Sequence, residues 1–243
     1  MKYYVAADIH GFYSIFREAL EQAGYFSDKG ECRLVILGDL FDRGNEAKEL
    51  QEFILEQMET GKLILMRGNH EDLFQELVTE DRGLPYDHHI HNGTYDTALQ
   101  LTGFTRDVAQ SQNFAFSLAA RQTPYYSKII PSMRDCHETE HYIFVHGWIP
   151  CIADRHTGYA YYPEWRDVDP FEWKRAHWFN GMDAVQTCRE EKTIVCGPGI
   201  LLTVTQSMKN GAPNLAPMRT IHPISRRGSS RWTPARCSAG RST

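Results

Sequence analysis

Short apolar runs recur along the first 197 residues of the chain, and each one ends at a loop. The runs are residues 3–7, 33–37, 62–66, 142–145 and 193–196. Continuous apolar runs of this length are typical of strands that are buried on both faces of a sheet. The pattern therefore predicts five strands in the core of the fold.

Helical patterns separate the first three of these strands. Residues 12–24 and 45–61 carry apolar side chains at the spacing of one helical face, and each segment ends at a glycine. A succession of strand, helix, strand, helix, strand requires parallel strands with right-handed crossovers, so we predict an α/β fold. Residues 94–120 are expected to be helical in part, and residues 125–140 are expected to form the arm of a hairpin.

Length and composition favour one catalytic domain, because 243 residues with 42% hydrophobic content can bury one large core. No apolar run approaches the roughly 18 to 20 residues that span a bilayer, and the N-terminus enters a strand without the apolar region of a signal peptide. The six cysteines include no Cys-x-x-Cys pair, so we expect reduced thiols. These features predict a soluble, cytoplasmic protein with no membrane partner.

The net charge of −5 conceals a change in composition near Gly197. Residues 198–243 hold seven of the 26 Lys and Arg residues and none of the 31 Asp and Glu residues. The first 197 residues therefore carry 19 basic against 31 acidic side chains, a balance of −12. We predict a boundary here, with one domain over residues 1–197 and an aberrant basic segment over residues 198–243.

Polar side chains cluster where the predicted strands end, which is where open α/β sheets collect their functional groups. In chain order the clusters are Asp8-x-His10, Gly38-Asp39-x-x-Asp42-Arg43-Gly44, Gly68-Asn69-His70-Glu71 and His146-Gly147. Carboxylate, imidazole and amide oxygen are ligands for divalent cations, and four such clusters at one sheet edge can hold two ions. A shared carboxylate, for which Asp39 is the candidate, would bridge them.

Each cluster has a structural alternative when it is taken alone. An isolated Asp-x-His is more often a helix cap or a surface turn. The carboxylates and the arginine of the second cluster could form a structural ion pair. The joint occurrence of all four clusters, in this order and at strand ends, favours an active site that hydrolyses phosphate esters.

The four motifs closely resemble those of the calcineurin-like metallophosphoesterases. The likeness is strongest to the branch of serine/threonine protein phosphatases and bacterial diadenosine tetraphosphatases with the Asp-Arg-Gly and Asn-His-Glu forms, and it covers about residues 1–197. It implies a four-layer sandwich of two mixed β-sheets flanked by helices. It also implies two divalent metal ions, which we expect to be manganese, with iron or zinc as alternatives. The first ion would be held by Asp8, His10 and Asp39, and the second by Asp39, Asn69 and His146.

The resemblance implies roles for three further residues. His70 would protonate the leaving alkoxide, Asp42 would orient His70, and Arg43 would clamp phosphate oxygens. These roles agree with the chemistry of the side chains, because histidine donates a proton near neutral pH and arginine matches phosphate in a bidentate fork.

Two other features have a functional and a structural interpretation. The histidine tract of His88, His89 and His91 could bind metal, but we favour a loop at the rim of the cleft. Arg175 lies near Trp173 and Trp178 and could be a second phosphate clamp, although an arginine beside aromatic residues is at least as often structural.

The family pattern breaks after the last predicted strand, where a Gly-His should complete the second metal site. Here Gly197 is followed by Pro198. With suitable codons, the bases of residues 198–205 read from the third base onward as Trp-His-Thr-Ser-Tyr-Gly-His, and restoring one base after Gly197 gives Gly-His-Trp-His-Thr-Ser-Tyr-Gly-His, which contains the missing Gly-His. The same shift across residues 223–233 permits an apolar run suited to a closing strand. We therefore hypothesise that residues 198–243 are out of frame.

Three functions are compatible with these motifs. The first is hydrolysis of a phosphate monoester, on a phosphoprotein or a small molecule, by attack of a metal-bridging hydroxide. The second is hydrolysis of a dinucleoside polyphosphate, for which Trp148, Trp165 and Trp173 are aromatic candidates. The third is a catalytically impaired member that acts as a binding protein. Nucleic-acid binding by the basic segment is not expected, because its arginines lack helical or aromatic order. The sequence leaves the oligomeric state open.

Overall fold

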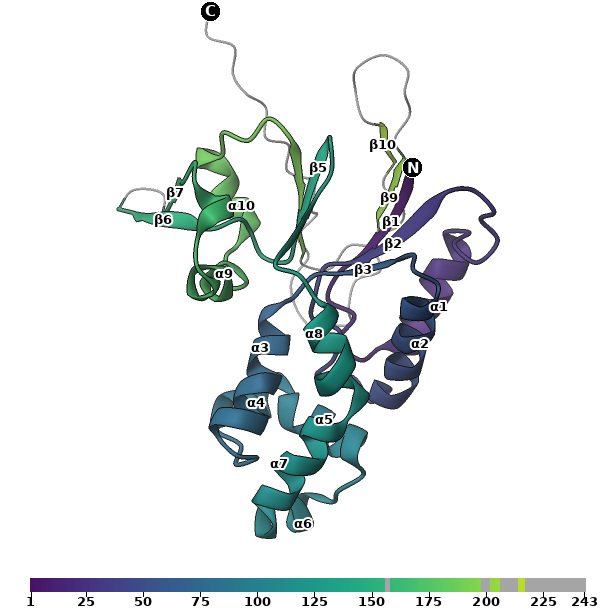
Figure 1. Ribbon diagram of the computed structural model, residues 1–243, viewed down its shortest axis with the longest axis vertical. Helices are drawn as coiled ribbons and strands as arrows, with labels where there is room; N and C mark the ends of the chain where they lie inside the picture. The colour runs from purple at the N-terminus through teal and green to yellow at the C-terminus, as the bar shows by residue number, and fades with distance from the viewer. Residues whose placement is uncertain (156–157, 198–201, 206–213, 217–243) are drawn as a thin grey trace, which may run out of the picture.

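The computed structural model describes residues 1–155, 158–197, 202–205 and 214–216, and its centre is a five-stranded mixed sheet (Figure 1). The strand order is β10-β9-β1-β2-β3. Strands β1, β2 and β3 are parallel to one another, and β9 runs antiparallel to β1. The strand bounds are β1 Lys2–Ala6, β2 Cys32–Ile36, β3 Leu63–Leu65, β9 Leu202–Thr205 and β10 Asn214–Ala216.

A second mixed sheet has the order β4-β5-β8, and a separate pair is formed by β6 and β7. Strand β5 is antiparallel to β4 and parallel to β8. The bounds are β4 Cys136–Glu138, β5 Tyr142–Val145, β8 Thr193–Val195, β6 Cys151–Asp154 and β7 Gly158–Tyr161. All five strands expected from the apolar runs are therefore present.

Successive side chains of the buried strands point to opposite faces of the sheet, and this alternation produces the layers. Tyr3 and Val5 of β1 pack with Phe144 of β5 in a cluster between the two sheets. Tyr4 and Ala6 point the other way, into the cluster that the helices cover. The opposite face of the second sheet packs on a third cluster that contains Trp165 and Trp173. Helices, sheet, sheet and helices thus form the four layers that the family resemblance implied.

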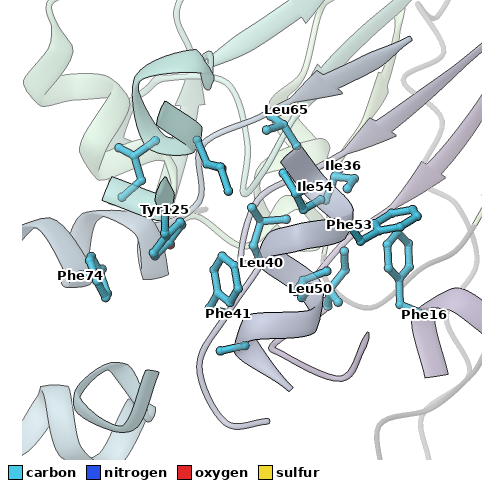
Figure 2. Close-up of a cluster of buried hydrophobic side chains, with 14 of the residues drawn as sticks. Phe16, Ile36, Leu40, Phe41, Leu50, Phe53, Ile54, Leu65, Phe74 and Tyr125 are labelled. Atoms are coloured by element: carbon cyan, nitrogen blue, oxygen red, sulfur yellow. The ribbon is translucent and has the colours of Figure 1, made fainter. Parts of the chain in front are cut away.

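Helices α1 and α2 are the two crossovers between the parallel strands. They span Tyr13–Gln22 and Ala47–Glu59, within the segments whose periodicity predicted them. Figure 2 shows Phe16 of α1 beside Phe53 of α2, with Ile54 next to Ile36 and Leu65 of the sheet. Burial of this apolar surface fixes the carboxyl ends of β1, β2 and β3 at one edge of the sheet.

A helical lobe follows β3 and lies on one side of the two sheets (Figure 1). Its elements are α3 Asn69–Gln75, η1 Glu76–Glu80, α4 Asp87–Asn92, α5 Thr94–Thr102, α6 Arg106–Ser111, α7 Asn113–Gln122, η2 Tyr125–Ile129 and α8 Ile130–Ser132. Phe74 of α3 and Tyr125 of η2 join the lobe to the main core. The histidine tract is helix α4 and not the expected loop.

The expected hairpin arm over residues 125–140 is only partly correct. Residues 125–132 are helical, and β4 alone pairs with β5. The remaining elements are η3 Trp165–Asp167, α9 Pro170–Ala176, α10 Gly181–Ala184 and η4 Val185–Thr187, and they cover the outer face of the second sheet. No helix in the described ranges is long and apolar enough to cross a membrane.

Most of the segment expected to be out of frame lies outside the described residues. The exceptions are β9 and β10, which extend the first sheet beyond β1. The backbone of the chain as written therefore supplies strands beside β1, although the sequence pattern predicted none there. The hypothesis of a frame change concerns the gene, and it stays a prediction.

Candidate metal centre and active site

Hydrogen bonds between the loops that follow β1 and β2 bring the first two motifs together. The His10 N–H donates to the Asp39 carbonyl at 3.0 Å, and the Gly11 N–H donates to the Leu40 carbonyl at 2.8 Å. The Gly44 N–H returns a bond to the His10 carbonyl at 2.8 Å. The two loops therefore form one backbone unit, and their side chains are positioned by the sheet.

Left-handed backbone conformations are concentrated in this unit. Six non-glycine residues of the described chain have positive φ, and all except Arg82 belong to the motifs: Asp8, His10, Asp39, Asp42 and Arg43. Such conformations are unfavourable for residues with a Cβ atom and persist where the surroundings enforce them. Here they turn the chain sharply at the strand ends, so that successive side chains face the same space.

Close backbone contact explains the glycines beside the ligands. A Cβ atom on Gly38, whose φ is +82°, would lie 2.6 Å from the Gly68 nitrogen and 2.9 Å from His146 Nδ1. The loops after β2 and β3 and the side chain of His146 after β5 therefore meet at a position where only glycine fits.

Each of two candidate ligand histidines has one ring nitrogen held by a backbone carbonyl. His10 Nδ1 lies 3.0 Å from the Phe41 carbonyl oxygen, and His146 Nδ1 lies 2.5 Å from that of Leu37. A carbonyl only accepts, so Nδ1 carries the proton in both rings and Nε2 presents a lone pair. Metal-binding histidines commonly have this arrangement, because the outer hydrogen bond fixes the tautomer and the ring orientation.

Asp39 lies between these two rings. Its Oδ1 is 3.4 Å from His146 Nε2, and its Oδ2 is 3.9 Å from His10 Nε2. Two groups of potential metal ligands share this carboxylate: His10, Asp39 and His70, and Asp8, Asp39 and His146. The geometry therefore supports Asp39 as the bridge between two ions.

The residues present fit a pair of cations. Asn69 Oδ1 lies 2.9 Å from His146 Nε2, so two lone pairs face each other across a buried gap. Asp8 Oδ1 is buried without a hydrogen-bond partner among the described residues. Burial disfavours the charged form of each group, so it raises the pKa of Asp8 to about 6 and lowers that of His10 to about 4. A bound cation would compensate the buried carboxylate and the opposed acceptors.

His70 forms a pair with Asp42 beside the metal ligands. His70 Nδ1 is 2.7 Å from Asp42 Oδ2, and both groups are buried. Burial lowers the pKa of His70, but the hydrogen bond to Asp42 and the charges of Asp39 and Asp42 outweigh it, so the net pKa is raised. His70 Nε2 faces the site, 3.8 Å from Asp39 Oδ2 and 3.3 Å from the Arg43 guanidinium. Arginine only donates, so Nε2 accepts in this contact, and the ring can take up a proton at Nε2 when the exposed Arg43 guanidinium turns to another acceptor.

Two threonines outside the four sequence motifs hold Asp42. The hydroxyl of Thr94 donates to Asp42 Oδ2 at 2.6 Å, and that of Thr97 donates to Oδ1 at 2.8 Å. Both threonines lie on one face of α5, three residues apart. This spacing is the one feature of the sequence that could have indicated a shared partner.

Glu71 is a further residue to which the sequence assigned no role, although it ends the third motif. Its side chain is fully buried. Oε2 accepts from the N–H groups of Asp39 (2.9 Å) and Gly68 (2.8 Å). Oε1 accepts from the Leu40 N–H (3.0 Å) and the Tyr125 hydroxyl (3.1 Å). One carboxylate therefore ties the loop after β2 to the start of α3.

The structure brings all eight predicted site residues together at one edge of the sheets. The grouping differs from the expectation in two respects. The potential ligand atoms of Asp8 cluster with His146 and not with His10, and His70, the expected proton donor, lies close enough to His10 and Asp39 to be a third potential ligand there. Arg175 does not join the site, since its guanidinium pairs with Glu172 of the same helix at 2.8 Å. Trp148, Trp165 and Trp173 are buried in the core against the second sheet.

A four-layer α/β sandwich with aspartate, histidine and asparagine side chains gathered at the strand ends is the architecture of a metallophosphoesterase. Residues 1–195 match the calcineurin-like phosphoesterase family. The chain belongs to this family, whose members bind two divalent metal ions.

Two curated relatives and one solved structure illustrate the similarity. The bis(5'-nucleosyl)-tetraphosphatase PrpE [asymmetrical] of Bacillus subtilis (strain 168) is 30% identical over 132 residues, which is 52% of each chain. The protein of the same name from Bacillus velezensis is 33% identical over 76 residues, 29% of this chain and 30% of that one. The matched segment thus spans about half the length of the first relative and less of the second.

The solved structure is a protein serine/threonine phosphatase from Saccharomyces cerevisiae with similarity to human PP5. It is 19% identical, with a TM-score of 0.41 over 70% of this chain and 44% of that one.

Replacement of Glu71 by glutamine tests the role of its carboxylate. A glutamine amide can accept on one side only, so at least one buried backbone N–H loses its acceptor. We expect the free energy of unfolding to fall by about 1–3 kcal/mol, and manganese affinity to fall about 10- to 100-fold because the ligand loops lose their support. Urea denaturation and calorimetric metal titration measure the two effects.

Glu49→Gln is the matched control, since Glu49 is exposed on α2. Unfolding energies and metal affinities that are equal in the two variants would contradict the assignment.

Proposed function

We propose that the protein is a metal-dependent phosphoesterase that hydrolyses phosphate monoesters. The observation that carries the proposal is the position of the His70–Asp42 pair, whose His70 Nε2 lies 3.8 Å from Asp39 Oδ2, the carboxylate that two groups of potential metal ligands share. A proton donor next to a two-metal site matches the requirements of phosphate ester hydrolysis, where a nucleophile must be generated and an alkoxide must be protonated. The substrate would be a phosphoprotein or a small phosphorylated molecule.

The metal ligands in this proposal are those of the first and third motifs with Asp39 and His146. Asp8, His10 and Asp39 would hold one ion, and Asp39, Asn69 and His146 the other. When bound, two divalent ions supply an activated water and charge stabilisation for the phosphoryl group, and manganese is the proposed metal.

His70 is the proposed general acid. Asp42 accepts from Nδ1 and thereby keeps the second proton available at Nε2, the nitrogen that faces the site. The raised pKa of His70 keeps the ring protonated further into the neutral range. Arg43 is the proposed phosphate clamp, because its exposed side chain ends 3.3 Å from His70 Nε2 and its guanidinium can take two phosphate oxygens at once.

A second candidate is the hydrolysis of a dinucleoside polyphosphate. The similarity to PrpE of Bacillus subtilis favours it. The burial of Trp148, Trp165 and Trp173 weighs against it, because these side chains are not free to stack on a nucleobase. We therefore rank the monoester first.

The region after Gly197 bears on whether the chain is fully active. Gly197 donates its N–H to the His146 carbonyl at 2.9 Å, and a Cβ atom on it would lie 3.2 Å from Asp8 Oδ1. A residue that directly follows Gly197 would therefore start beside two proposed ligands, and Pro198 has no group that can bind metal. We propose that residues 1–197 form the catalytic domain, that the second ion is weakly held, and that residues 198–243 are out of frame.

An assay on an aryl phosphate with added manganese tests the function. We expect weak, manganese-dependent hydrolysis by this chain, a much higher rate from a frame-restored version, and loss of activity in Asp39→Asn. Asp96→Asn is the control, because Asp96 is exposed and pairs with Arg106. Absence of hydrolysis in both versions would reject the phosphoesterase. Equal rates in the two would show that the altered segment supplies no ligand.

The pH dependence of kcat tests the proton donor. Protonated His70 is needed, so activity is present below its raised pKa and is lost as the pH rises through it. In Asp42→Asn the pKa of His70 falls, and we expect the basic limb of the profile to move to lower pH, with kcat about 10²-fold lower at its optimum. Asparagine also tolerates the left-handed backbone at position 42, where φ is 75°. An unchanged basic limb would rule out this role for the pair.

A comparison of substrates separates the two candidate functions. We expect kcat/KM for an aryl phosphate or a phosphopeptide to exceed that for diadenosine tetraphosphate, since the buried tryptophans provide no stacking surface. Both substrates are measured on the same preparation, with liquid chromatography of the nucleotide products. A higher kcat/KM for diadenosine tetraphosphate would select the second candidate.

A further inference from the structure

A second group of potential metal ligands lies in the helical lobe, outside the candidate active site. It consists of Glu76, Asp81, His88 and His89, which come from η1, the residue after it, and α4. One ligand atom from each residue lies within 4.8 Å of the others. Two imidazoles and two carboxylates are a donor set suited to zinc, which binds four such ligands tetrahedrally.

A π-helical turn places the two carboxylates together. The Asp81 N–H donates to the Glu76 carbonyl at 3.0 Å, the five-residue bond of a π turn. In an α-helix of 3.6 residues per turn, residues five apart lie on different faces. The wider π turn brings residue 81 back over residue 76, and π turns are frequently found at functional sites.

His89 is the observation that points to a ligand. Its side chain is fully buried, and its Nε2 has no hydrogen-bond partner among the described residues. The nearest charged atom is Asp81 Oδ2, at 3.7 Å, which is itself buried and lacks a hydrogen bond within the described part of the chain. A distance of 3.7 Å is too long for a hydrogen bond, but it is close to the separation of two ligands on one ion.

The other two residues close the group from the solvent side. His88 Nε2 is 3.1 Å from Glu76 Oε1, and the rings of His88 and His89 are 4.0 Å apart between centroids. The side chain of His88 is 44% exposed, which leaves a path for an ion to enter. Burial lowers the pKa of His89 to about 4, so the ring is neutral at physiological pH, as a metal ligand must be.

We propose that Glu76, Asp81, His88 and His89 form a site for one zinc ion, separate from the catalytic centre. The ion would bind His89 Nε2, which moves the ring proton to Nδ1. Nδ1 now accepts from the Tyr86 N–H at 3.2 Å, and that hydrogen bond would be lost. The site thus exchanges one long hydrogen bond for a metal bond and neutralises two crowded carboxylates.

The position of the site gives the ion a role. Element η1 continues directly from α3, which carries Asn69 and His70, and α4 is joined through Gly93 to α5. Thr94 and Thr97 of α5 hold Asp42. An ion shared by η1 and α4 would therefore tie together the two segments that position the His70–Asp42 pair. This inference does not depend on the proposed reaction.

Equilibrium dialysis against zinc, with metal analysis of the full chain, tests the site. The measurement is made in the Asp39→Asn background, where the catalytic centre is weakened and binding in the lobe can be counted. We expect one zinc per chain that is lost, or bound at least tenfold more weakly, in His88→Gln and in Glu76→Gln. His91→Gln is the matched control, since His91 is an exposed residue of the same helix whose Nδ1 bonds to the Asp87 carbonyl.

Circular dichroism establishes that each variant is folded, and both test positions lie at the exposed side of the group. Equal zinc binding in His88→Gln, Glu76→Gln and the background protein would overturn the proposal. A loss of zinc in His91→Gln as large as that in His88→Gln would also overturn the proposal, because it would show that any histidine of the tract can bind the ion. The result is independent of activity, so an inactive catalytic centre leaves the test intact.

Discussion

The hydrogen bonds of the Glu71 carboxylate are the constraint on which the site depends. Four donors from four different residues converge on it, in a position that is fully closed to solvent. A buried carboxylate is unfavourable unless its lone pairs are satisfied, so these donors and the carboxylate require one another. Because two of the donors are the N–H groups of Asp39 and Leu40, the same interaction fixes the proposed bridging ligand. The left-handed turns at the strand ends are then held by the loops on either side.

Charge crowding is the consequence of that constraint. Asp8, Asp39 and Asp42 are held near three histidines in a largely buried space, where like charges repel strongly. The fold supplies partners for Asp42 through two threonines and His70, but within the described residues it leaves Asp8 Oδ1 without one. This imbalance distinguishes the proposed proton-donor half of the site, whose polar atoms have partners in the protein, from the proposed metal half, where one buried carboxylate oxygen has none among the described residues.

The parts of the fold that could be predicted from the sequence are those with local signals. Buried strands and crossover helices have periodic apolar patterns, and the ligands follow strands, so their meeting at one edge could be inferred from topology. The helical lobe has weaker signals, because its helices are short and its π turns have no distinctive pattern. Thr94 and Thr97 could not be assigned, since their partner Asp42 is more than 50 residues away in the sequence. The prediction of a loop at the histidine tract is wrong. Most residues of helix α4 are polar, so the tract has no apolar pattern that would indicate a helix, although His89 is buried.

The backbone at the end of the last core strand is positioned by contacts with residues of the candidate metal site. Gly197 bonds to the backbone of His146 and approaches Asp8, so the backbone passes beside two of the proposed metal ligands. Pro198 has no group that can bind metal. In the proposed arrangement, the contacts of Gly197 with His146 and Asp8 would direct the next residue toward the proposed metal ligands. These contacts are made by residues before position 198, so a change of the residue after Gly197 would alter the proposed ligand set without removing them.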